Sequence, residues 1–130
     1  MIVVDASVLV NLLVYADGDG QKAREALLRD ADWTAPEHWK VEVFSVIRSL
    51  AIGQKIDEAI AIQAVVQLPH LAVESAQLDG LLARMWRLRD NISGHDSAYV
   101  ALAQVRKSTL FTADARLARA AAAHCGVELV

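Results

Sequence analysis

The spacing of apolar residues changes several times along the chain, and each change indicates a new element. A short β-branched run at residues 2–4 ends at Asp5 and predicts a buried strand, and the apolar residues at 7–14 then predict a helix. Two Asp-Gly pairs within residues 15–20 predict a loop. Pro36 is expected in the first turn of a helix that ends before Gly53.

The same patterns divide the rest of the chain. They predict strands at residues 2–4, 32–35, 71–73, 108–111 and 126–130. They predict helices at residues 7–14, 21–29, 36–52, 58–67 (with Asp57 as its cap), 75–90, 96–106 and 114–124.

Strands that alternate with helices indicate the α/β fold class. We expect a three-layer α/β/α sandwich with a mainly parallel central sheet of about five short strands, covered on both faces. A length of 130 residues fits one domain over residues 1–130. In open sheets of this kind, functional sites lie beyond the carboxyl ends of the strands, so candidate residues are sought there.

Composition adds two expectations. Apolar residues make up 55% of the chain, above the usual share of about half, and a domain with such a surplus often buries part of it against a partner. The longest charge-free stretches, residues 6–16 and 59–73, fall short of the roughly 20 apolar residues that span a bilayer. The single cysteine, Cys125, has no partner for an internal disulfide. We therefore expect a cytoplasmic protein.

The net charge of −3 does not exclude a nucleic acid as a partner, because the distribution of charge matters more than its sum. If four of the 16 acidic residues gather at one metal site, twelve remain against 13 lysines and arginines. The rest of the surface is then close to neutral.

Two acidic residues follow directly after predicted strands. Asp5 ends the first strand, and Asp114 follows the strand at 108–111. Because the carboxyl ends of parallel strands meet at one edge of a sheet, both side chains are expected there. Each acid has an alternative interpretation as a helix cap or first-turn acid, which the helix dipole favours.

Two further acids belong to predicted helices. Asp96 begins an apolar helix whose face continues through Val100 and Ala103, and an acid on a buried stripe is costly unless it is paired or metal-bound. Its alternative role is again a helix cap. Glu42 lies inside the helix that follows Pro36, and taken alone it is best explained as a surface residue paired with Lys40 or Arg48.

The four acids together predict a cation site. Two carboxylates about 4 Å apart repel by roughly 4 kcal/mol at an effective dielectric constant of 20. A cluster of them therefore demands either protons or a cation. Oxygen ligands suit Mg²⁺ or Mn²⁺, and the lack of Cys and His clusters disfavours zinc. Bound Mg²⁺ can activate water and stabilise the charge that develops in phosphodiester cleavage, which indicates a nuclease.

Three motifs in order resemble those of the PIN-domain ribonucleases, and most closely the VapC toxins of bacterial toxin–antitoxin pairs. They are VDASVL at residues 4–9, NISGHDSAYVALA at residues 91–103 and LFTADARL at residues 110–117. Glu42 falls in the middle helix, where the family carries its second acid. The order, the spacing and the total length agree, so the resemblance covers nearly the whole chain.

The resemblance implies that Asp5, Glu42, Asp96 and Asp114 form a magnesium site, with Asp5 and Asp96 as direct ligands. It implies that Ser7 and Thr112 are hydroxyl residues beside the acids, although both can equally cap helices. His95 stands where relatives often have an aromatic residue, and we interpret it as a packing residue.

The resemblance also implies partners: an RNA substrate, a second copy of the chain and a VapB-type antitoxin that blocks the site with a basic segment. Arg116, two residues after Asp114, is the best-placed candidate for contact with an RNA phosphate. We expect the three tryptophans, Trp33, Trp39 and Trp86, in the core or at an interface. Residues 56–68 are apolar around most of a helix and are expected, with the helix bearing Trp39, to form a homodimer contact or an antitoxin groove.

Other functions remain as alternatives. A receiver-like phosphotransfer domain also gathers acids around magnesium, but it needs a second acid near Asp5. A haloacid-dehalogenase-type phosphatase needs an Asp where this chain has Ser7. A PIN-like domain that binds without cleaving is the third alternative, and the presence of all four acids gives no reason to prefer it.

Overall fold

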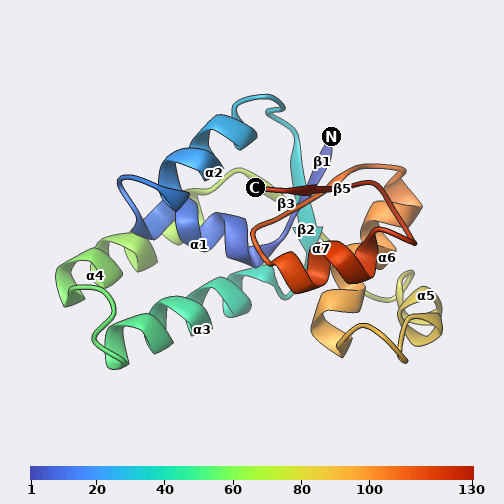
Figure 1. Ribbon diagram of the computed structural model, residues 1–130. Coiled ribbons are helices and arrows are strands. Elements are labelled where there is room, and N and C mark those ends of the chain that lie inside the picture. Colours follow the sequence, from blue (N-terminus) through green and yellow to red (C-terminus); the bar gives the residue numbers. More distant parts are fainter.

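A computed structural model describes residues 1–130 as five strands and seven α-helices (Figure 1). The strands are β1 (Ile2–Val4), β2 (Trp33–Pro36), β3 (Val73–Ala76), β4 (Leu110–Thr112) and β5 (Val127–Leu129). The helices are α1 (Ala6–Val14), α2 (Asp19–Leu27), α3 (Trp39–Ile52), α4 (Glu58–Gln67), α5 (Leu82–Arg87), α6 (Gly94–Arg106) and α7 (Ala115–Ala121). A 3₁₀ turn, η1 (Leu68–His70), follows α4.

The strands form one sheet in the order β3-β2-β1-β4-β5, and every neighbouring pair is parallel. Val3 of β1 pairs with Thr34 on one side and with Leu110 on the other, so β1 is the central strand. Helices α1–α4 lie on one side of the sheet and α5–α7 on the other (Figure 1). The predicted α/β/α fold is confirmed.

The central strand is completely buried because helices cover both of its faces. Helix α1 packs against α2, α3 and α4, and α6 packs against β1, β2 and β4. One core of 31 apolar residues runs through all three layers and includes Trp39, Tyr99 and Leu102. Burial of this apolar surface, at about 25 cal/mol per Å², is the main force that holds the layers together. None of the helices is both long and apolar enough to cross a membrane.

The order of the chain reverses at β1. From β1 the chain proceeds outward to β2 and β3, then returns across the sheet to β4 and β5. The loops after β1 and β4 therefore separate in opposite directions and leave a crevice at their carboxyl ends, which is the position where open α/β sheets bind ligands. Asp5 and Asp114 follow these two strands.

The prediction for residues 71–90 was wrong. The strand is Val73–Ala76 rather than 71–73, and the helix is Leu82–Arg87 rather than 75–90. All four residues of β3 pair with β2, from Trp33 opposite Val73 to Pro36 opposite Ala76. Pairing along the edge of the sheet thus outweighs the helical spacing of the leucines in this segment, because tertiary contacts routinely override local preference.

Two smaller boundaries also differ. Pro36 ends β2 instead of beginning a helix, and α3 starts three residues later. Helix α2 starts at Asp19, inside the predicted loop. Gly20 allows this early start, since a Cβ atom there would overlap the Tyr15 carbonyl oxygen. A glycine without that atom lets α2 pass directly over the end of α1.

Candidate active site

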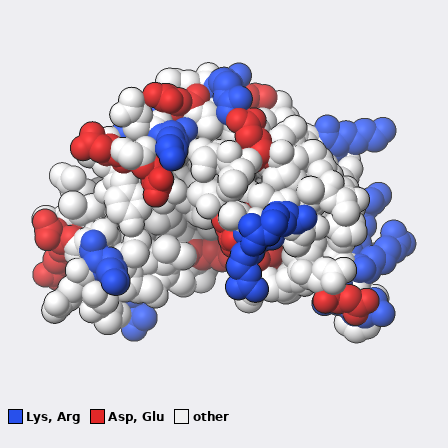
Figure 2. All heavy atoms as spheres, in the orientation of Figure 1, with Lys and Arg blue, Asp and Glu red and all other residues white.

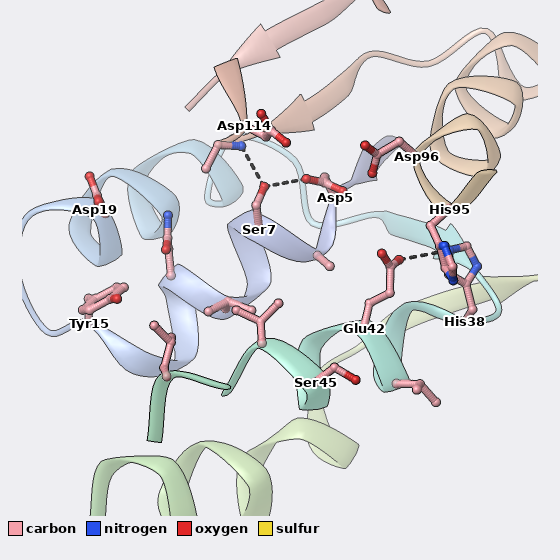
Figure 3. Close-up of a pocket in the computed structure, with 17 residues that line it drawn as sticks. Asp5, Ser7, Tyr15, Asp19, His38, Glu42, Ser45, His95, Asp96 and Asp114 are labelled. Atoms are coloured by element: carbon pink, nitrogen blue, oxygen red, sulfur yellow. Dashed lines mark hydrogen bonds and ion pairs between the residues drawn. The ribbon is translucent and has the colours of Figure 1, made fainter. Parts of the chain in front are cut away.

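Five acidic residues line one open pocket at the carboxyl ends of β1 and β4 (Figure 3). Asp5, Glu42, Asp96 and Asp114 lie together in this cavity, which we call the acid pocket, and Asp19 lies apart from them beside Tyr15. The four residues come from the β1–α1 junction, α3, the start of α6 and the β4–α7 junction. The fold therefore brings together the four acids that the sequence singled out, although they lie up to 109 positions apart in the chain.

Asp5 is the most enclosed of the four acids, with only 5% of its surface exposed. It occupies the N-cap position of α1, yet its carboxylate makes no capping hydrogen bond. It accepts hydrogen bonds from the Ser7 hydroxyl at 2.5 Å and from the Thr112 hydroxyl at 2.9 Å. The interpretation of Asp5 as a simple helix cap was therefore wrong, because two side chains hold its carboxylate toward the pocket.

Ser7 and Thr112 tie the two strand ends together. Their hydroxyl oxygens are 3.4 Å apart. Ser7 Oγ also accepts the backbone N–H of Ala113 at 2.9 Å, and Thr112 Oγ1 accepts that of Asp114 at 3.0 Å. These contacts fix the Asp5 carboxylate relative to the turn before α7. Such supporting hydrogen bonds orient acidic ligands in metal sites.

Asp114 both caps a helix and lines the pocket. Its Oδ1 atom accepts the backbone N–H groups of Arg116 at 2.9 Å and Leu117 at 3.3 Å, so the interpretation as a cap of α7 is confirmed. Its Oδ2 atom has no hydrogen-bond partner in the protein. The Arg116 side chain lines a smaller adjoining pocket together with Asp96 and Asp114.

Asp96 lies in the first turn of α6 and is half-buried. The cap of this helix is Ser93, whose hydroxyl accepts the backbone N–H of Asp96 at 3.3 Å, so the capping interpretation of Asp96 was wrong. Val100 and Ala103 on the same helix are buried as expected. The Asp96 carboxylate itself has no hydrogen bond or ion pair within the protein.

Glu42 pairs with neither Lys40 nor Arg48, contrary to the surface interpretation. The Tyr99 hydroxyl donates a hydrogen bond to Glu42 Oε1 at 2.7 Å, and the His38 Nε2 atom lies 3.0 Å from the same oxygen. Burial, together with the Glu42 charge, raises the pKa of the Tyr99 hydroxyl above its ordinary value. Tyr99 therefore remains protonated and acts as a donor.

The electrostatics of the pocket are those of crowded acids. The pKa of Asp5 is raised from 3.8 to about 6, chiefly by burial and to a smaller extent by the nearby charges of Asp96 and Glu42. The hydrogen bonds from Ser7 and Thr112 oppose this rise, because they favour the charged form. A divalent cation in the pocket would offset the repulsion among the acids and favour the ionised form of Asp5.

The donors in the pocket fit a hard divalent cation by their chemistry. All four acids offer carboxylate oxygens, which are the ligands that Mg²⁺ and Mn²⁺ prefer. No three His, Cys, Asp or Glu side chains are already arranged as a complete set of metal ligands. Magnesium commonly keeps several waters and takes only one or two protein carboxylates, so it does not need a full protein cage.

Two residues that contact Glu42 were not singled out from the sequence: His38, which lines the pocket, and Tyr99, which does not. Their signals were present: His38 precedes Glu42 by four residues on one helix face, and Tyr99 follows Asp96 by three. The His38 ring meets the rings of His95 and Tyr99 edge to face, with centroids 5.6 Å apart in each pair. His95, predicted to be a packing residue, thus makes an aromatic contact at the rim of the pocket.

Comparison with known families gives one match, the PIN domain, over residues 2–123. This chain belongs to the PIN-domain family. Curated relatives place it among the VapC-type PIN-domain proteins. Ribonuclease VapC9 of Mycobacterium tuberculosis is 35% identical over 130 residues, which are 100% of this chain and 98% of the relative. Ribonuclease VapC12 of the same organism is also 35% identical, and the match covers 100% of this chain and 99% of the VapC12 chain.

Solved structures agree on the PIN fold. The crystal structure of Mycobacterium tuberculosis VapC20, a toxin that cleaves the sarcin–ricin loop, superposes with a TM-score of 0.70 at 15% identity and covers 92% of this chain and 95% of that one. FitAcB from Neisseria gonorrhoeae superposes with a TM-score of 0.65 at 18% identity, covering 98% and 96%. At these identities the likeness concerns the fold alone.

Proposed function

We propose that this PIN domain is the toxin of a type II toxin–antitoxin pair and acts as a magnesium-dependent endoribonuclease. The observation that carries the proposal is the acid pocket, whose lining holds five acidic residues, four of them clustered, and no lysine or arginine. The relatives named as VapC ribonucleases supply the substrate class, RNA. An RNA substrate implies a cytoplasmic site of action, and residues 1–130 act as one nuclease domain built around the single core.

Asp5, Glu42, Asp96 and Asp114 are the residues that would hold the ion, with Asp5 and Asp96 as its direct ligands. Bound Mg²⁺, or Mn²⁺ in its place, supplies a water of lowered pKa and positive charge beside the scissile phosphate. A bound ion would explain why four acids lie together. Without it, burial and repulsion disfavour the charged form of Asp5, as its raised pKa indicates.

The chain itself orients these acids. Ser7 and Thr112 fix the Asp5 carboxylate, and the protonated Tyr99 fixes one oxygen of Glu42. Held side chains of this kind lose little freedom when the substrate arrives, which is the basis of preorganised catalysis. Arg116, beside Asp96 and Asp114, is placed to contact an RNA phosphate and bring the strand to the pocket.

A cleavage assay tests the proposal and separates it from a binding-only module. Purified protein is incubated with structured and single-stranded RNA in the presence of Mg²⁺, with and without excess chelator, and beside the Asp96→Asn variant. We expect cleavage with Mg²⁺ that chelator and substitution both abolish. Binding of RNA without any cleavage would leave the chain as an interaction module.

The outer face of α3 and α4 is the proposed partner surface. Helix α4 buries Ala61 and Ala64 and leaves its valines and isoleucines partly or largely exposed. We define the α3–α4 face by these exposed residues: Val41, Phe44, Val46, Ile52, Ile60, Ile62, Val65 and Val66. Val41 and Val46 also line the acid pocket, so this apolar face continues into the site.

Exposed apolar residues in such number indicate a buried interface in the assembled protein. We propose that the α3–α4 face binds a second copy of the chain or an amphipathic helix of a VapB-type antitoxin, whose basic segment then reaches the acid pocket. The alternative, in which these residues pack inside one subunit, does not agree with their exposure.

Sedimentation of the Val65→Glu and Ala64→Glu variants tests the interface. Val65 is 37% exposed, so its substitution should leave the fold intact and weaken self-association or antitoxin binding. Ala64 is fully buried, and a charge there should lower the free energy of unfolding by several kcal/mol. Two results together would contradict the proposed interface: a wild-type protein that sediments as a monomer, and a Val65→Glu variant that binds the antitoxin as tightly as the wild type does.

A further inference from the structure

Helix α5 presents a tryptophan to solvent. Trp86 is 68% exposed, whereas Trp39 is completely buried, so Trp86 does not belong to the core. Leu82, one turn earlier on the same face, is exposed as well. The Arg89 guanidinium lies 4.5 Å from the Trp86 ring centroid, and Arg89 donates a hydrogen bond to the Trp86 carbonyl oxygen. A large aromatic ring held in this way offers a flat surface to a ligand.

The cations around this ring are not paired with acids. Residues 82–89 contain three arginines and no acidic residue. None of Arg84, Arg87 and Arg89 forms an ion pair, whereas Arg29 and Arg106 are paired with glutamates elsewhere in the fold. Asp79 and Asp90 flank the segment but contact none of these arginines. The α5 arginines are therefore free to meet an anion.

Two separate hollows lie between the acid pocket and α5, one beside α7 and one past its end. The first adjoins the acid pocket and is lined by Asp96, Asp114 and Arg116 together with the loop before α6. The second lies past the other end of α7, between His124 and the arginines Arg84 and Arg87. Basic side chains lie over α7 beside the acidic hollow, with more at the edge of the molecule toward α5 (Figure 2; compare Figure 1).

We infer that an RNA strand leaves the acid pocket along α7 and ends on α5, where Arg84 and Arg87 contact phosphates and Trp86 stacks on a base. The inference rests on the proposed function, because it takes RNA as the ligand. Aromatic rings among cations are the common means of holding single-stranded nucleic acid. A helix of seven residues is about 10 Å long, so a few nucleotides span the distance.

The charge of α5 favours RNA over a protein as the occupant. A purely apolar docking helix would gain nothing from three unpaired arginines, whose charges would have to be desolvated at the interface. Phosphates neutralise such cations and release counterions from the strand, which is favourable at moderate salt. A protein partner on α5 is therefore the competing outcome of the test.

The test measures binding without cleavage. All proteins carry Asp96→Asn, and the probe is a fluorescently labelled single-stranded RNA of mixed sequence, about 20 nucleotides long. The α5 variants are Trp86→Ala and the double variant Arg84→Ala, Arg87→Ala. The control double variant is Arg48→Ala, Lys55→Ala, which removes the same charge from exposed, unpaired residues beside the α3–α4 face. Fluorescence anisotropy at several salt concentrations gives each affinity, and thermal melting confirms that each variant is folded.

We expect Trp86→Ala to weaken RNA binding about fivefold or more through lost stacking. The α5 double variant should make the dependence of log affinity on log salt less steep by about 1.4, because about 0.7 is lost for each phosphate contact. The control should change neither quantity. Unchanged affinity in the α5 variants, or an equal loss in the control, would overturn the inference, as would a protein that α5 binds in place of RNA.

Cleavage kinetics in proteins that keep the native Asp96 separate this inference from the proposed function. The α5 variants should raise the KM for RNA and leave kcat unchanged, since α5 lies away from the acids. Cleavage with an unaltered KM would keep the nuclease and reject the α5 track. Binding of RNA that depends on α5, without cleavage by the wild type, would keep the track and reject the nuclease.

Discussion

Two groups of acidic residues in this PIN domain have opposite surroundings. Asp30, Glu74 and Glu128 each meet a full positive charge: the amino terminus at 2.8 Å, Arg106 at 2.7 Å and Arg29. None of the four clustered acids of the pocket forms an ion pair with a lysine, an arginine or the amino terminus, and only His38 lies close to Glu42. The paired acids have a structural role in their ion pairs. Unpaired acids that gather in one place indicate instead a ligand that supplies the compensating positive charge.

The pKa directions express the same difference. A hydrogen bond from the amino terminus lowers the pKa of Asp30, so the folded protein stabilises the charged form of this carboxyl. Burial raises the pKa of Asp5 to about 6, so its charge is costly there. Functional sites commonly hold such perturbed groups because their chemistry requires them. The comparison therefore predicts that substitutions in the pocket affect activity, and that substitutions of paired acids affect only stability.

The largest expected effect is that of Asp96→Asn on RNA cleavage. Loss of one carboxylate that holds the ion should lower kcat about a thousandfold, or roughly 4 kcal/mol of transition-state stabilisation. Because the Asp96 carboxylate has no partner within the protein, the metal-free variant should be at least as stable as the wild type. Full activity in a well-folded Asp96→Asn protein would remove this residue from the site.

The next effect is a pH dependence of stability without metal. Asp5 has a pKa of about 6 in the folded protein and an ordinary value of 3.8, so between these values the folded state binds the proton more tightly. The free energy of unfolding should therefore fall as the pH rises from about 4 to 6, by up to about 3 kcal/mol. Well below pH 4 the carboxyl is protonated in both states, so this stability is fully present and no longer changes with pH.

Denaturant titrations across this range measure the fall. Asp5→Asn, which cannot ionise, should largely abolish it, and saturating Mg²⁺ should reduce it in the wild type. A fall that persists unchanged in Asp5→Asn would have to come from other groups, and the buried charge of Asp5 would then not be costly.

A smaller effect is expected from Tyr99→Phe. This substitution removes the hydroxyl that donates to Glu42 at 2.7 Å and keeps the buried ring. A less firmly held Glu42 should lower kcat about tenfold, or roughly 1.4 kcal/mol, with little change in KM. Tyr15→Phe is the control, because Tyr15 lines the acid pocket but donates no hydrogen bond to an acid. Equal effects of the two substitutions would leave Tyr99 without a positioning role.

The smallest effect is expected from Glu74→Gln in the paired group. The ion pair of Glu74 with Arg106 lies partly exposed at the surface, and pairs of this kind contribute about 0–1 kcal/mol. Cleavage should be unchanged, and salt should reduce what little stability the pair provides. A large loss of activity in Glu74→Gln would break the division between the two groups of acids.

The sequence predicted the acid pocket better than it predicted several boundaries of the fold. Asp5 and Asp114 were expected together because parallel strands place their carboxyl ends at one edge, and this rule depends only on topology. Residues 71–90 failed because the pairing of β3 with β2 decides their structure, and a helical spacing of leucines carries no information about that pairing. Long-range contacts of this kind are not visible in local patterns.

Side-chain partners were the other limit of the sequence. Nothing in the pattern around Glu42 indicated that Tyr99, 57 residues away, would donate to it. Likewise, Trp86 and Trp39 were both expected in the core or at an interface, yet Trp86 is exposed and Trp39 is buried. Both outcomes depend on how α3, α5 and α6 pack against the sheet and one another, which only the three-dimensional structure reveals.

Metal-linked stability tests most directly the claim that the pocket acids await a cation. A ligand that binds only the folded state, at 100 times its Kd, adds about 2.7 kcal/mol to the free energy of unfolding. Thermal melting of the wild type with and without millimolar Mg²⁺ or Mn²⁺ should therefore show a clear rise in Tm. The Asp5→Asn, Asp96→Asn double variant should lose that rise, and Glu74→Gln should keep it. Equal shifts in the wild type and the double variant would mean that the ion acts elsewhere, and would contradict the account.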